Sequence, residues 1–172
     1  MGKKEQSLYK IDIQGLAFKE HIFEFEVVSA FFSLFENSPV SVGNCYCKSV
    51  LTKTETMISI SFEIKGSVEL ICDRSLKKFN YPILTKNNVI FKYGDEWQEL
   101  DDELYEIPSN LDQLDVAPFI YEFIILALPM KKLHPDFAEN SEIDEVIYST
   151  ESEKKEENTL NPMWENLKKL KK

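Results

Sequence analysis

The sequence contains few of the residues, and none of the motifs, by which enzymes are usually recognised. Its two histidines, His21 and His134, lie far apart along the chain. No nucleophile elbow, P-loop, dinucleotide-binding glycine pattern or H-E-x-x-H zinc motif occurs. For a histidine without partners of this kind, a surface or capping position is favoured over a functional one. We therefore expect neither catalysis nor a cofactor.

Long apolar segments and paired cysteines are also absent. The longest apolar run, Phe119 to Leu128, is interrupted by Glu122 and falls short of the roughly 20 residues that a membrane-spanning helix needs. Met1 to Gln6 is charged and no apolar stretch follows it directly, so no signal peptide is predicted. The three cysteines are an odd number, and Cys45 and Cys47 are too close for an easy disulfide along a strand. These features predict reduced thiols in a cytoplasm.

Charge is strongly unbalanced. The chain carries 30 Asp and Glu against 20 Lys and Arg, which gives a formal net charge of -10. Nucleic-acid phosphates and anionic lipids repel such a protein overall, so we expect neither DNA nor a membrane as partner. Contact with RNA requires a local basic patch or a basic protein as intermediary. The global charge favours a basic protein partner, and the oligomeric state stays open.

Alternating hydrophobicity predicts a sheet in the first two-thirds of the chain. Phe23 to Val27 and Ile58 to Ile64 alternate apolar and polar residues with period two. Val68 to Cys72 continues after a glycine, which predicts a hairpin across Lys65-Gly66. A further strand is predicted at Asn88 to Tyr93. Strands this close in sequence favour antiparallel pairing.

Two helices interrupt or follow this pattern. Ser29 to Phe35 has near-helical apolar spacing and a candidate N-cap at Ser29. Asp115 to Leu128 begins with a good N-cap, carries a proline in its first turn and is stopped by Pro129. This helix is apolar nearly all round, so we expect it to be packed inside.

The predicted fold is therefore α+β: an antiparallel sheet of about five to six strands, packed by one central apolar helix, with a short C-terminal helix. We expect one domain over residues 1–138. Residues 139–158 are rich in Asp, Glu, Ser and Lys and read as an acidic flexible linker. Residues 159–172 read as a basic amphipathic helix that starts at Asn161-Pro162.

Two metal hypotheses arise from the residues. Cys45, Cys47, Cys72 and His134 form a conceivable Cys3His zinc set, but buried free thiols are common and are the favoured explanation of the cysteines. Ser75 stands where a second cysteine would complete a C-x-x-C corner with Cys72. The acidic run between Asp95 and Glu103 lacks the central glycine and alternating ligands of an EF-hand, so it reads as a solvated loop that offers a negative face.

Three segments carry a resemblance to a known family. Gly66 to Leu76 (GSVELICDRSL) resembles the strand and C-D-R-C-L turn of the YceD family. Asp115 to His134 (DVAPFIYEFIILALPMKKLH) is similar to that family's helix and following histidine. Asn161 to Leu170 (NPMWENLKKL) is similar to its D-P-R-W-x-x-L-x-x-L tail. Order and spacing agree, and the chain looks like a Bacteroidetes-like member with a degenerate motif.

The resemblance implies a factor needed for accumulation of large-subunit ribosomal RNA. The residues that match the family's motif positions are Cys72, Asp73, Arg74, Glu122, Pro129 and His134. Family members with two cysteines in the turn are suspected metal binders, and Ser75 implies that this chain has lost that feature. Asn161 and Met163 also depart from the tail's usual Asp and Arg.

Physical chemistry suggests roles for some of these residues. An unpaired carboxylate inside an apolar helix is costly, so Glu122 either pairs with Arg74 or faces solvent. Trp164 and Leu167 on a tethered basic helix either dock on a partner or pack back onto their own domain. We predict Asp73, Arg74, Glu122, His134, Trp164 and Leu167 as partner-binding residues and no metal site.

The functional prediction is a non-enzymatic ribosome-biogenesis factor. It would bind the large ribosomal subunit precursor, through pre-ribosomal RNA or a basic ribosomal protein, by complementary charge. The alternative is an acidic protein–protein adaptor unrelated to ribosomes.

Overall fold

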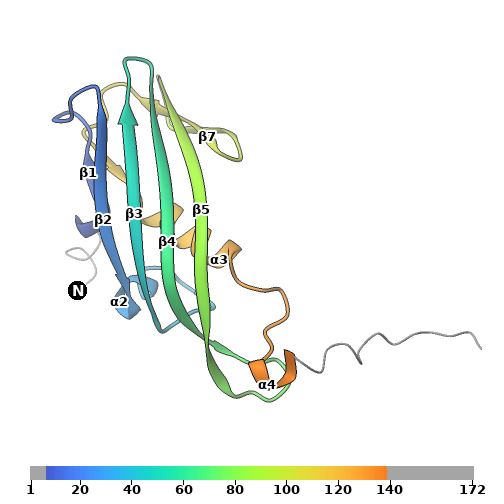
Figure 1. Cartoon of the computed structure of the whole chain (residues 1–172). Helices are drawn as coiled ribbons and strands as arrows, with labels where there is room; N and C mark the ends of the chain where they lie inside the picture. The colour runs from blue at the N-terminus through green and yellow to red at the C-terminus, as the bar shows by residue number, and fades with distance from the viewer. Residues whose placement is uncertain (1–6, 139–172) are drawn as a thin grey trace, which may run out of the picture. The chain divides into compact units, whose positions relative to one another are not determined.

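The fold is built on four long antiparallel strands that lie side by side (Figure 1). A computed structural model describes residues 7–138 of the chain, which clusters into two compact units, Met1–Pro135 and Asp136–Lys172. The predicted linker 139–158 and the predicted C-terminal helix 159–172 lie outside the described residues. The elements are η1 (Ser7–Tyr9, a 3-10 turn), β1 (Lys10–Asp12), β2 (Glu20–Val28), α2 (Ser29–Phe32), β3 (Gly43–Lys53), β4 (Met57–Ile71), β5 (Lys78–Gly94), β6 (Gln98–Asp101), β7 (Leu104–Pro108), β8 (Gln113–Asp115), α3 (Ala117–Leu126) and α4 (Pro135–Ala138).

The main sheet has six strands in the order β2-β3-β4-β5-β7-β6, and β1 pairs with β8 in a separate two-stranded sheet. The prediction of an α+β fold with a mostly antiparallel sheet is confirmed. One pair departs from the expectation: β7 runs parallel to β5, with Ile90 opposite Leu104 and Gly94 opposite Pro108. The chain reaches this arrangement because β6 is the outer strand and β7 returns antiparallel to it, into the place beside β5.

The hairpin predicted at Lys65-Gly66 is wrong. β4 continues through this point without a break, and Gly66 pairs with Cys45 on one side and with Ile83 on the other. The glycine is required because its φ is +156° and because a Cβ would lie 2.5 Å from the Cys45 Cα atom. The glycine thus marks a close approach of β3, and the turn comes after Ile71.

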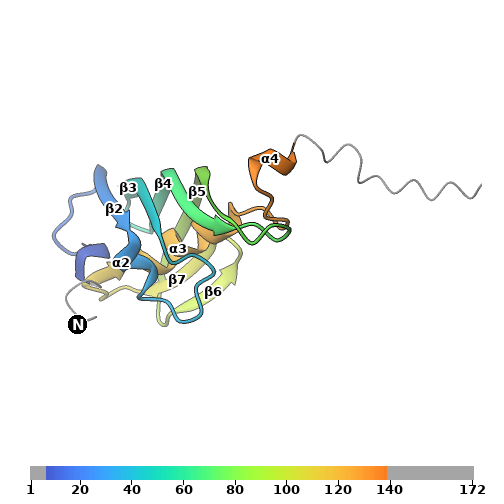
Figure 2. The same cartoon turned by 90° about the horizontal axis from the view of Figure 1, so that it is seen from below.

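The core lies on one face of the sheet. Ile58, Ile60, Phe62 and Ile64 of β4 all point to this face and are fully buried, as the alternation predicts. Figure 2 shows α2, α3 and β7 on this same side of β2 to β5. The Phe62 ring lies 5.5 Å from that of Phe123 in α3. The opposite face carries a row of charges, Glu24, Lys48, Glu63 and Lys86, on four neighbouring strands.

Helix α3 is shorter and more one-sided than expected. It begins after Val116, which occupies the N-cap position. The predicted N-cap, Asp115, lies one residue earlier, and its carboxylate accepts the Ala117 N–H at 3.0 Å. Pro118, Glu122 and Leu126, spaced by four residues, form an exposed stripe along it. The expectation that this helix is packed inside on all sides is therefore wrong. One face packs on the sheet, and the apolar composition extends beyond that face.

Helix α2 is a single turn with Val28 at the N-cap position. Ser29 makes no capping hydrogen bond there, and its hydroxyl instead accepts the Gly43 N–H at 3.4 Å. The predicted cap at Ser29 is therefore wrong, although the helix itself is confirmed. The Phe35 ring after the helix stacks on Tyr121 of α3 at 3.9 Å. This contact fixes the loop that follows α2 against α3.

Candidate functional site

The turn between β4 and β5 is the most distinctive local structure of the described chain. Cys72 begins it, and the Cys72 N–H donates to the Lys77 carbonyl oxygen at 2.9 Å. The Leu76 N–H donates back to the Cys72 carbonyl oxygen at 2.9 Å, and Leu76 has a left-handed φ of 56°. These bonds close a tight loop that holds Arg74 and Lys77 on its outside, where both are exposed.

A segment distant in sequence is fastened to this turn. The chain after α3 passes beside it, and the Asp73 N–H donates to the Lys132 carbonyl oxygen at 2.8 Å. In return the Lys132 N–H donates to Asp73 Oδ2 at 2.7 Å. The His134 N–H donates to Cys72 Sγ at 3.3 Å, and the His134 ring packs edge-on against Phe79 at 5.7 Å. The structure thus brings Asp73, Arg74 and His134 of the sequence prediction together.

The Cys72 sulfur lies at the centre of this arrangement. It is fully buried and accepts N–H groups from His134 and, at 3.5 Å, from Ser75. The pKa of the Cys72 thiol is lowered to about 7, chiefly by the Ser75 hydroxyl close to it, while burial works in the opposite direction. Backbone N–H groups from Ser75, His134 and Arg74 add to the lowering. Donors that converge on a sulfur in this way stabilise its thiolate form.

The other two cysteines are of a different kind. Cys45 and Cys47 lie on the core face of β3 and are buried. Burial raises the pKa of the Cys45 thiol, and it raises that of Cys47 to about 11. Cys45 is opposite Gly66 in the register, whereas Cys72 follows the end of β4 six residues further on. The three sulfurs therefore do not share one location.

These positions do not fit a metal. Within residues 7–138, no group of three or more His, Cys, Asp or Glu side chains is placed to hold an ion. At the turn, the Cys72 sulfur is satisfied by backbone donors, and a serine hydroxyl is a poor zinc ligand. The buried Ser75 Oγ makes no hydrogen bond of good geometry with the described part of the chain.

Glu122 lies apart from the turn. Its side chain is exposed on the outer stripe of α3, so the cost of burial that motivated a pair with Arg74 is absent. Two exposed ion pairs lie on the sheet instead, where Lys65 pairs with Glu63 and Lys78 pairs with Glu69, each at 2.7 Å. The solvent-facing alternative for Glu122 is therefore correct. Trp164 and Leu167 lie outside the described residues.

Five cations gather at the turn, a feature that sequence reasoning missed. Arg74, Lys77 and Lys78 belong to the turn itself, and Lys131 and Lys132 are brought to it by the Asp73 bonds. We call this set the basic turn. All of these side chains are exposed except that of Lys132, which is partly covered. Two pairs of adjacent lysines that flank the motif residues, 77–78 and 131–132, were the signal in the sequence.

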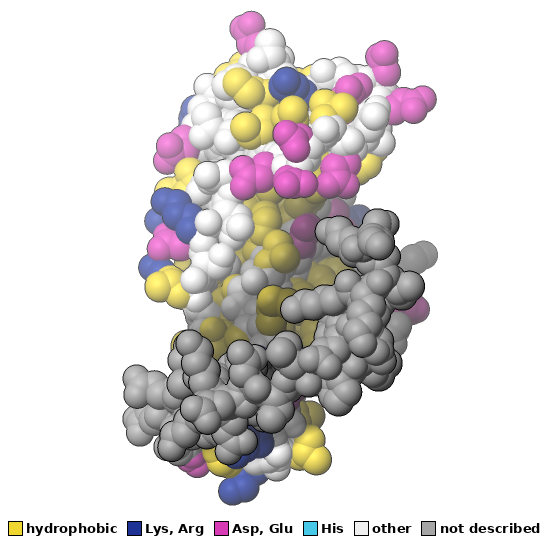
Figure 3. Space-filling view, turned by 90° about the vertical axis from the view of Figure 1, so that its right-hand side faces the viewer, with side chains coloured by type: hydrophobic (Ala, Val, Ile, Leu, Met, Phe, Trp, Pro, Cys, Tyr) yellow, Lys and Arg dark blue, Asp and Glu magenta, His cyan; other side chains and the backbone are white. Residues whose placement is uncertain are grey.

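The opposite end of β5 is acidic. From residue 93 to residue 130 the chain has ten Asp and Glu and no Lys or Arg. Residues 95–103, which include β6, are exposed throughout. β5 separates this acidic segment from the basic turn by 17 residues, or about 50 Å of strand. Figure 3 shows acidic side chains crowded over the upper part of this side of the molecule, and dark blue Lys and Arg side chains near its top, along its left edge and at its lower end.

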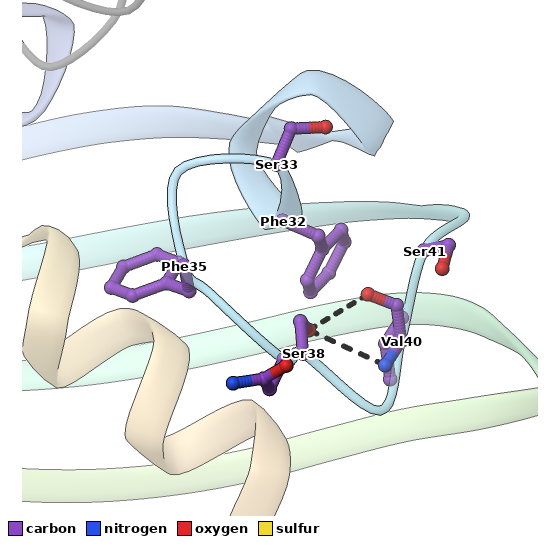
Figure 4. Close-up of a pocket in the computed structure, with 7 residues that line it drawn as sticks. Phe32, Ser33, Phe35, Ser38, Val40 and Ser41 are labelled. Carbon is purple, nitrogen blue, oxygen red and sulfur yellow. Dashed lines mark hydrogen bonds between the residues drawn. The ribbon is translucent and has the colours of Figure 1, made fainter.

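Two pockets of the described chain could hold a small molecule. The first, of about 240 Å³, lies under the loop after α2 (Figure 4). Its Ser38 hydroxyl is used locally, since it donates to the Val40 carbonyl oxygen and accepts the Val40 N–H. No titratable side chain lines it. The second, of about 200 Å³, borders the basic turn and is lined by Lys78, Lys132, Glu69 and Ser41 among others. Both are smaller than typical cofactor sites.

The fold and the turn define an α+β protein organised around a C-x-x-S turn, with a following helix whose C-terminal extension returns to that turn. The sequence model described as "Large ribosomal RNA subunit accumulation protein YceD" matches residues 60–171. The chain belongs to this family, as the resemblance predicted. The match begins within β4 and includes the turn, the acidic segment and α3.

A curated relative supports the assignment. "Uncharacterized protein YlbN" of Bacillus subtilis (strain 168) is 30% identical over 127 residues, which cover 72% of this chain and 68% of the relative. No solved structure matches the chain. The family name implies a role in the accumulation of large-subunit ribosomal RNA. No helix within residues 7–138 is long and apolar enough to cross a membrane.

Proposed function

We propose that this protein supports accumulation of large-subunit ribosomal RNA as a non-enzymatic factor in the cytoplasm. It does so by binding the large-subunit precursor, through pre-ribosomal RNA or a basic ribosomal protein. Membership of the family supports the role in ribosomal RNA accumulation. The separated charges on the surface support binding as the way in which the protein performs this role. Binding a precursor lowers the population of its exposed forms by mass action, so less of it is open to degradation.

The separation of charge along β5 carries the proposal. Residues 93–130 formally account for the whole net charge of -10, so the rest of the chain is neutral on balance. The basic turn and the exposed acidic segment, residues 95–103, lie at opposite ends of β5, and about 50 Å of strand separates them, much more than a Debye length of about 8 Å. A ribosomal precursor offers both signs of charge, in its RNA and in its basic proteins, so each end of the sheet has a complementary surface.

The predicted partner-binding residues take different parts in this proposal. Arg74 is exposed and can meet a phosphate or carboxylate with two parallel hydrogen bonds. Asp73 and His134 hold the turn through the bonds described above and act as positioning residues. Glu122 adds to the negative charge on the outer side of α3. Trp164 and Leu167 stay proposed as a docking face of the tail.

An acidic adaptor unrelated to ribosomes is the second candidate. The exposure of Trp97 and Leu100, at 51% and 46%, favours it. An apolar ring amid carboxylates is a common anchor for a basic protein partner. An adaptor function requires no RNA. It differs from the ribosomal function in the complex with which the protein associates.

Sedimentation separates the two candidates. Tagged full-length protein is run through sucrose gradients of cell lysate at low salt and again at high salt. We expect it to travel with large-subunit precursors at low salt and to be released as salt rises, because complementary charge is screened. Protein that stays with small complexes at every salt concentration would refute the ribosomal proposal and favour the adaptor.

The tail is tested in the same gradients. Deletion of Asn161 to Lys172 should reduce the fraction that travels with precursors if this segment docks on the partner. A double substitution, Trp164→Ala with Leu167→Ala, keeps the four lysines at its end and so separates apolar docking from charge. Unchanged sedimentation of both variants would count against docking by the tail.

A further inference from the structure

We propose that Trp97 and the carboxylates around it form a docking site for an arginine-rich segment of a basic protein. We call this surface, made of Trp97, Glu99, Asp102, Tyr105 and Glu122, the acidic aromatic patch. The assignment rests on the proposed function, because it takes a basic ribosomal protein as the source of the segment, and it gives that partner a place on the described chain. Figure 3 shows acidic side chains next to hydrophobic ones on this side of the molecule.

The aromatic part of the patch is a half-exposed ring that packs against the core. Trp97 keeps 51% of its surface exposed. Its ring centroid lies 6.3 Å from that of Phe91 and 6.4 Å from that of Tyr105. Both of these rings also contact Phe119 of α3, at 5.3 and 5.1 Å. The indole is therefore ordered before a partner arrives, so binding costs less side-chain entropy than at a free tryptophan.

The carboxylates come from separate elements and act on the same aromatic residue. The Tyr105 hydroxyl donates to Glu99 Oε1 of β6 at 3.5 Å. Burial raises the pKa of this hydroxyl, and the negative charges of Glu99, Glu122 and Asp102 raise it further. Glu122 belongs to α3, and Asp102 belongs to the turn between β6 and β7. Negative charge is therefore assembled around Tyr105 from three parts of the chain.

No cation of the described chain neutralises these carboxylates. Within residues 7–138, none of the three takes part in an ion pair, and the sequence has no Lys or Arg from residue 93 to residue 130. A concentration of like charge is unfavourable until cations approach it. In the described part of the chain, no three His, Cys, Asp or Glu side chains are placed to hold one metal ion. Several cations carried on one segment fit such spread charges better than a single ion does.

Arginine is the cation that can meet both parts of the patch. A guanidinium group stacks on an indole face by cation–π attraction, and its edge can pair with a carboxylate at the same time. RNA phosphates are repelled by the carboxylates. A second copy of this protein, with a net charge of -10, would bring further negative charge to the contact. The occupant that fits is therefore a segment of a separate basic protein.

The edge of the main sheet gives such a segment its path. β6 is the last strand in the sheet order, and all four of its residues are exposed. Trp97 precedes β6 and Asp102 follows it, so an extended segment of about six residues spans both, at about 3.3 Å per residue. The register of β6 shifts between Glu99 and Asp101, which disrupts regular strand pairing along this edge. Side chains rather than a continuous backbone ladder would thus hold the segment, and Leu100, 46% exposed, adds an apolar contact.

The first test is fluorescence anisotropy of full-length protein with a labelled peptide of four Arg-Ser repeats. Trp97→Ala removes the ring, and we expect the peptide to bind about 10-fold more weakly. Glu99→Gln combined with Glu122→Gln removes two charges and keeps the shape of both side chains, and we expect a loss of about 5-fold. Because the double variant leaves the ring packing intact, it gives a result even where Trp97→Ala unfolds the protein.

The matched control, E20Q/E26Q, also removes two exposed carboxylates. Both lie on β2, at the opposite edge of the main sheet from β6. We expect this variant to change the affinity for the peptide less than twofold, because screening limits the reach of each charge.

A direct readout comes from Trp97 itself. The chain has two tryptophans, so Trp164→Phe leaves Trp97 as its single indole. In this variant the peptide, which contains no aromatic residue, should shift the tryptophan emission to shorter wavelength, because the bound segment excludes water from the ring. Unchanged emission at a saturating peptide concentration would overturn the inference.

Four other results would overturn it as well. The first is unchanged peptide affinity in either W97A or E99Q/E122Q, and the second is an equal loss in E20Q/E26Q, which would indicate net charge alone. The third is tighter binding of an oligouridylate of eight nucleotides that is lost in W97A, which would make RNA the occupant. The fourth is peptide binding that appears only after deletion of residues 161–172, which would make this basic segment of the chain the occupant.

The sedimentation experiment keeps the two proposals apart. If wild-type protein and W97A travel equally with large-subunit precursors, the assignment of the partner to the patch fails and the proposed function stands. If wild-type protein never travels with precursors, the proposed function fails, and the peptide affinities alone then decide whether the patch binds a basic protein.

Discussion

Substitution of Gly66 by alanine tests the continuity of β4, on which the placement of the basic turn depends. A Cβ at this position would overlap the Asn44 carbonyl oxygen and lie 2.5 Å from the Cys45 Cα atom, where ordinary contacts are 3.4–4 Å. Both neighbours are backbone of β3 and cannot rotate away. The φ of +156° adds strain for any residue with a side chain.

The expected loss can be worked out from these two effects. Overpacking against a rigid neighbour costs about 1–3 kcal/mol, and an unfavourable φ costs about 1–3 kcal/mol more. We expect G66A to lower the free energy of unfolding by about 4 kcal/mol, a large part of the 5–15 kcal/mol typical of a domain. With an m-value of about 2 kcal/mol per molar urea, the midpoint should fall by about 2 M.

The measurement is urea unfolding followed by circular dichroism. Gly15→Ala is the control, because nothing lies within 4 Å of a Cβ built at Gly15. Its midpoint should stay within about 0.3 M of wild type, since substitutions away from packed features change stability little. A G66A midpoint equally close to wild type would refute the continuous strand and support a turn at this point.

Two further predictions concern the core and the thiol of the turn. Phe62→Ala should lower the free energy of unfolding by about 3–5 kcal/mol because the Phe62 ring is fully buried. Phe18→Ala is the control: the Phe18 residue is 66% exposed and its ring lies beneath Lys53, so its loss should cost about 1 kcal/mol or less. Equal urea midpoints of the two variants would contradict the burial of Phe62. The Cys72 pKa of about 7 lies below the ordinary 9.0, so the unfolded chain binds more protons between these values and the thiolate should stabilise the fold as pH rises from 7 to 9. The difference in urea midpoint between wild type and Cys72→Ser should therefore grow from pH 7 to pH 9, and a constant difference would contradict the lowered pKa.

The strands show where local pattern suffices and where it does not. Alternation at Ile58 to Ile64 predicted the buried face correctly, because a side-chain period of two is a property of the strand itself. Gly66 was misread because a glycine needed for a close approach of β3 has the same local signature as a turn glycine. The parallel pairing of β7 with β5 depends on the path of β6, which no local pattern encodes.

The helix and the candidate site also show that a local sequence pattern cannot reveal contacts between distant segments. The apolar sequence of Asp115 to Leu128 predicted the helix, but composition could not reveal that Leu126 stays 70% exposed because one face alone meets the sheet. At the site, the motif identified the Cys72 turn and its histidine. The cation cluster was not predicted, because Lys132 reaches Asp73 only through the return of the chain after α3.

Because β5 holds the cations of the basic turn apart from the carboxylates of residues 95–103, the described part of the chain is an electric dipole along this strand. A body of this kind near a polyanion experiences a torque as well as a force, and the torque acts before any contact forms. With RNA, the positive end is drawn forward while the carboxylate-rich end is turned away. Fewer collisions then occur in the wrong orientation, so dissolved salt slows productive encounter by weakening alignment as well as attraction.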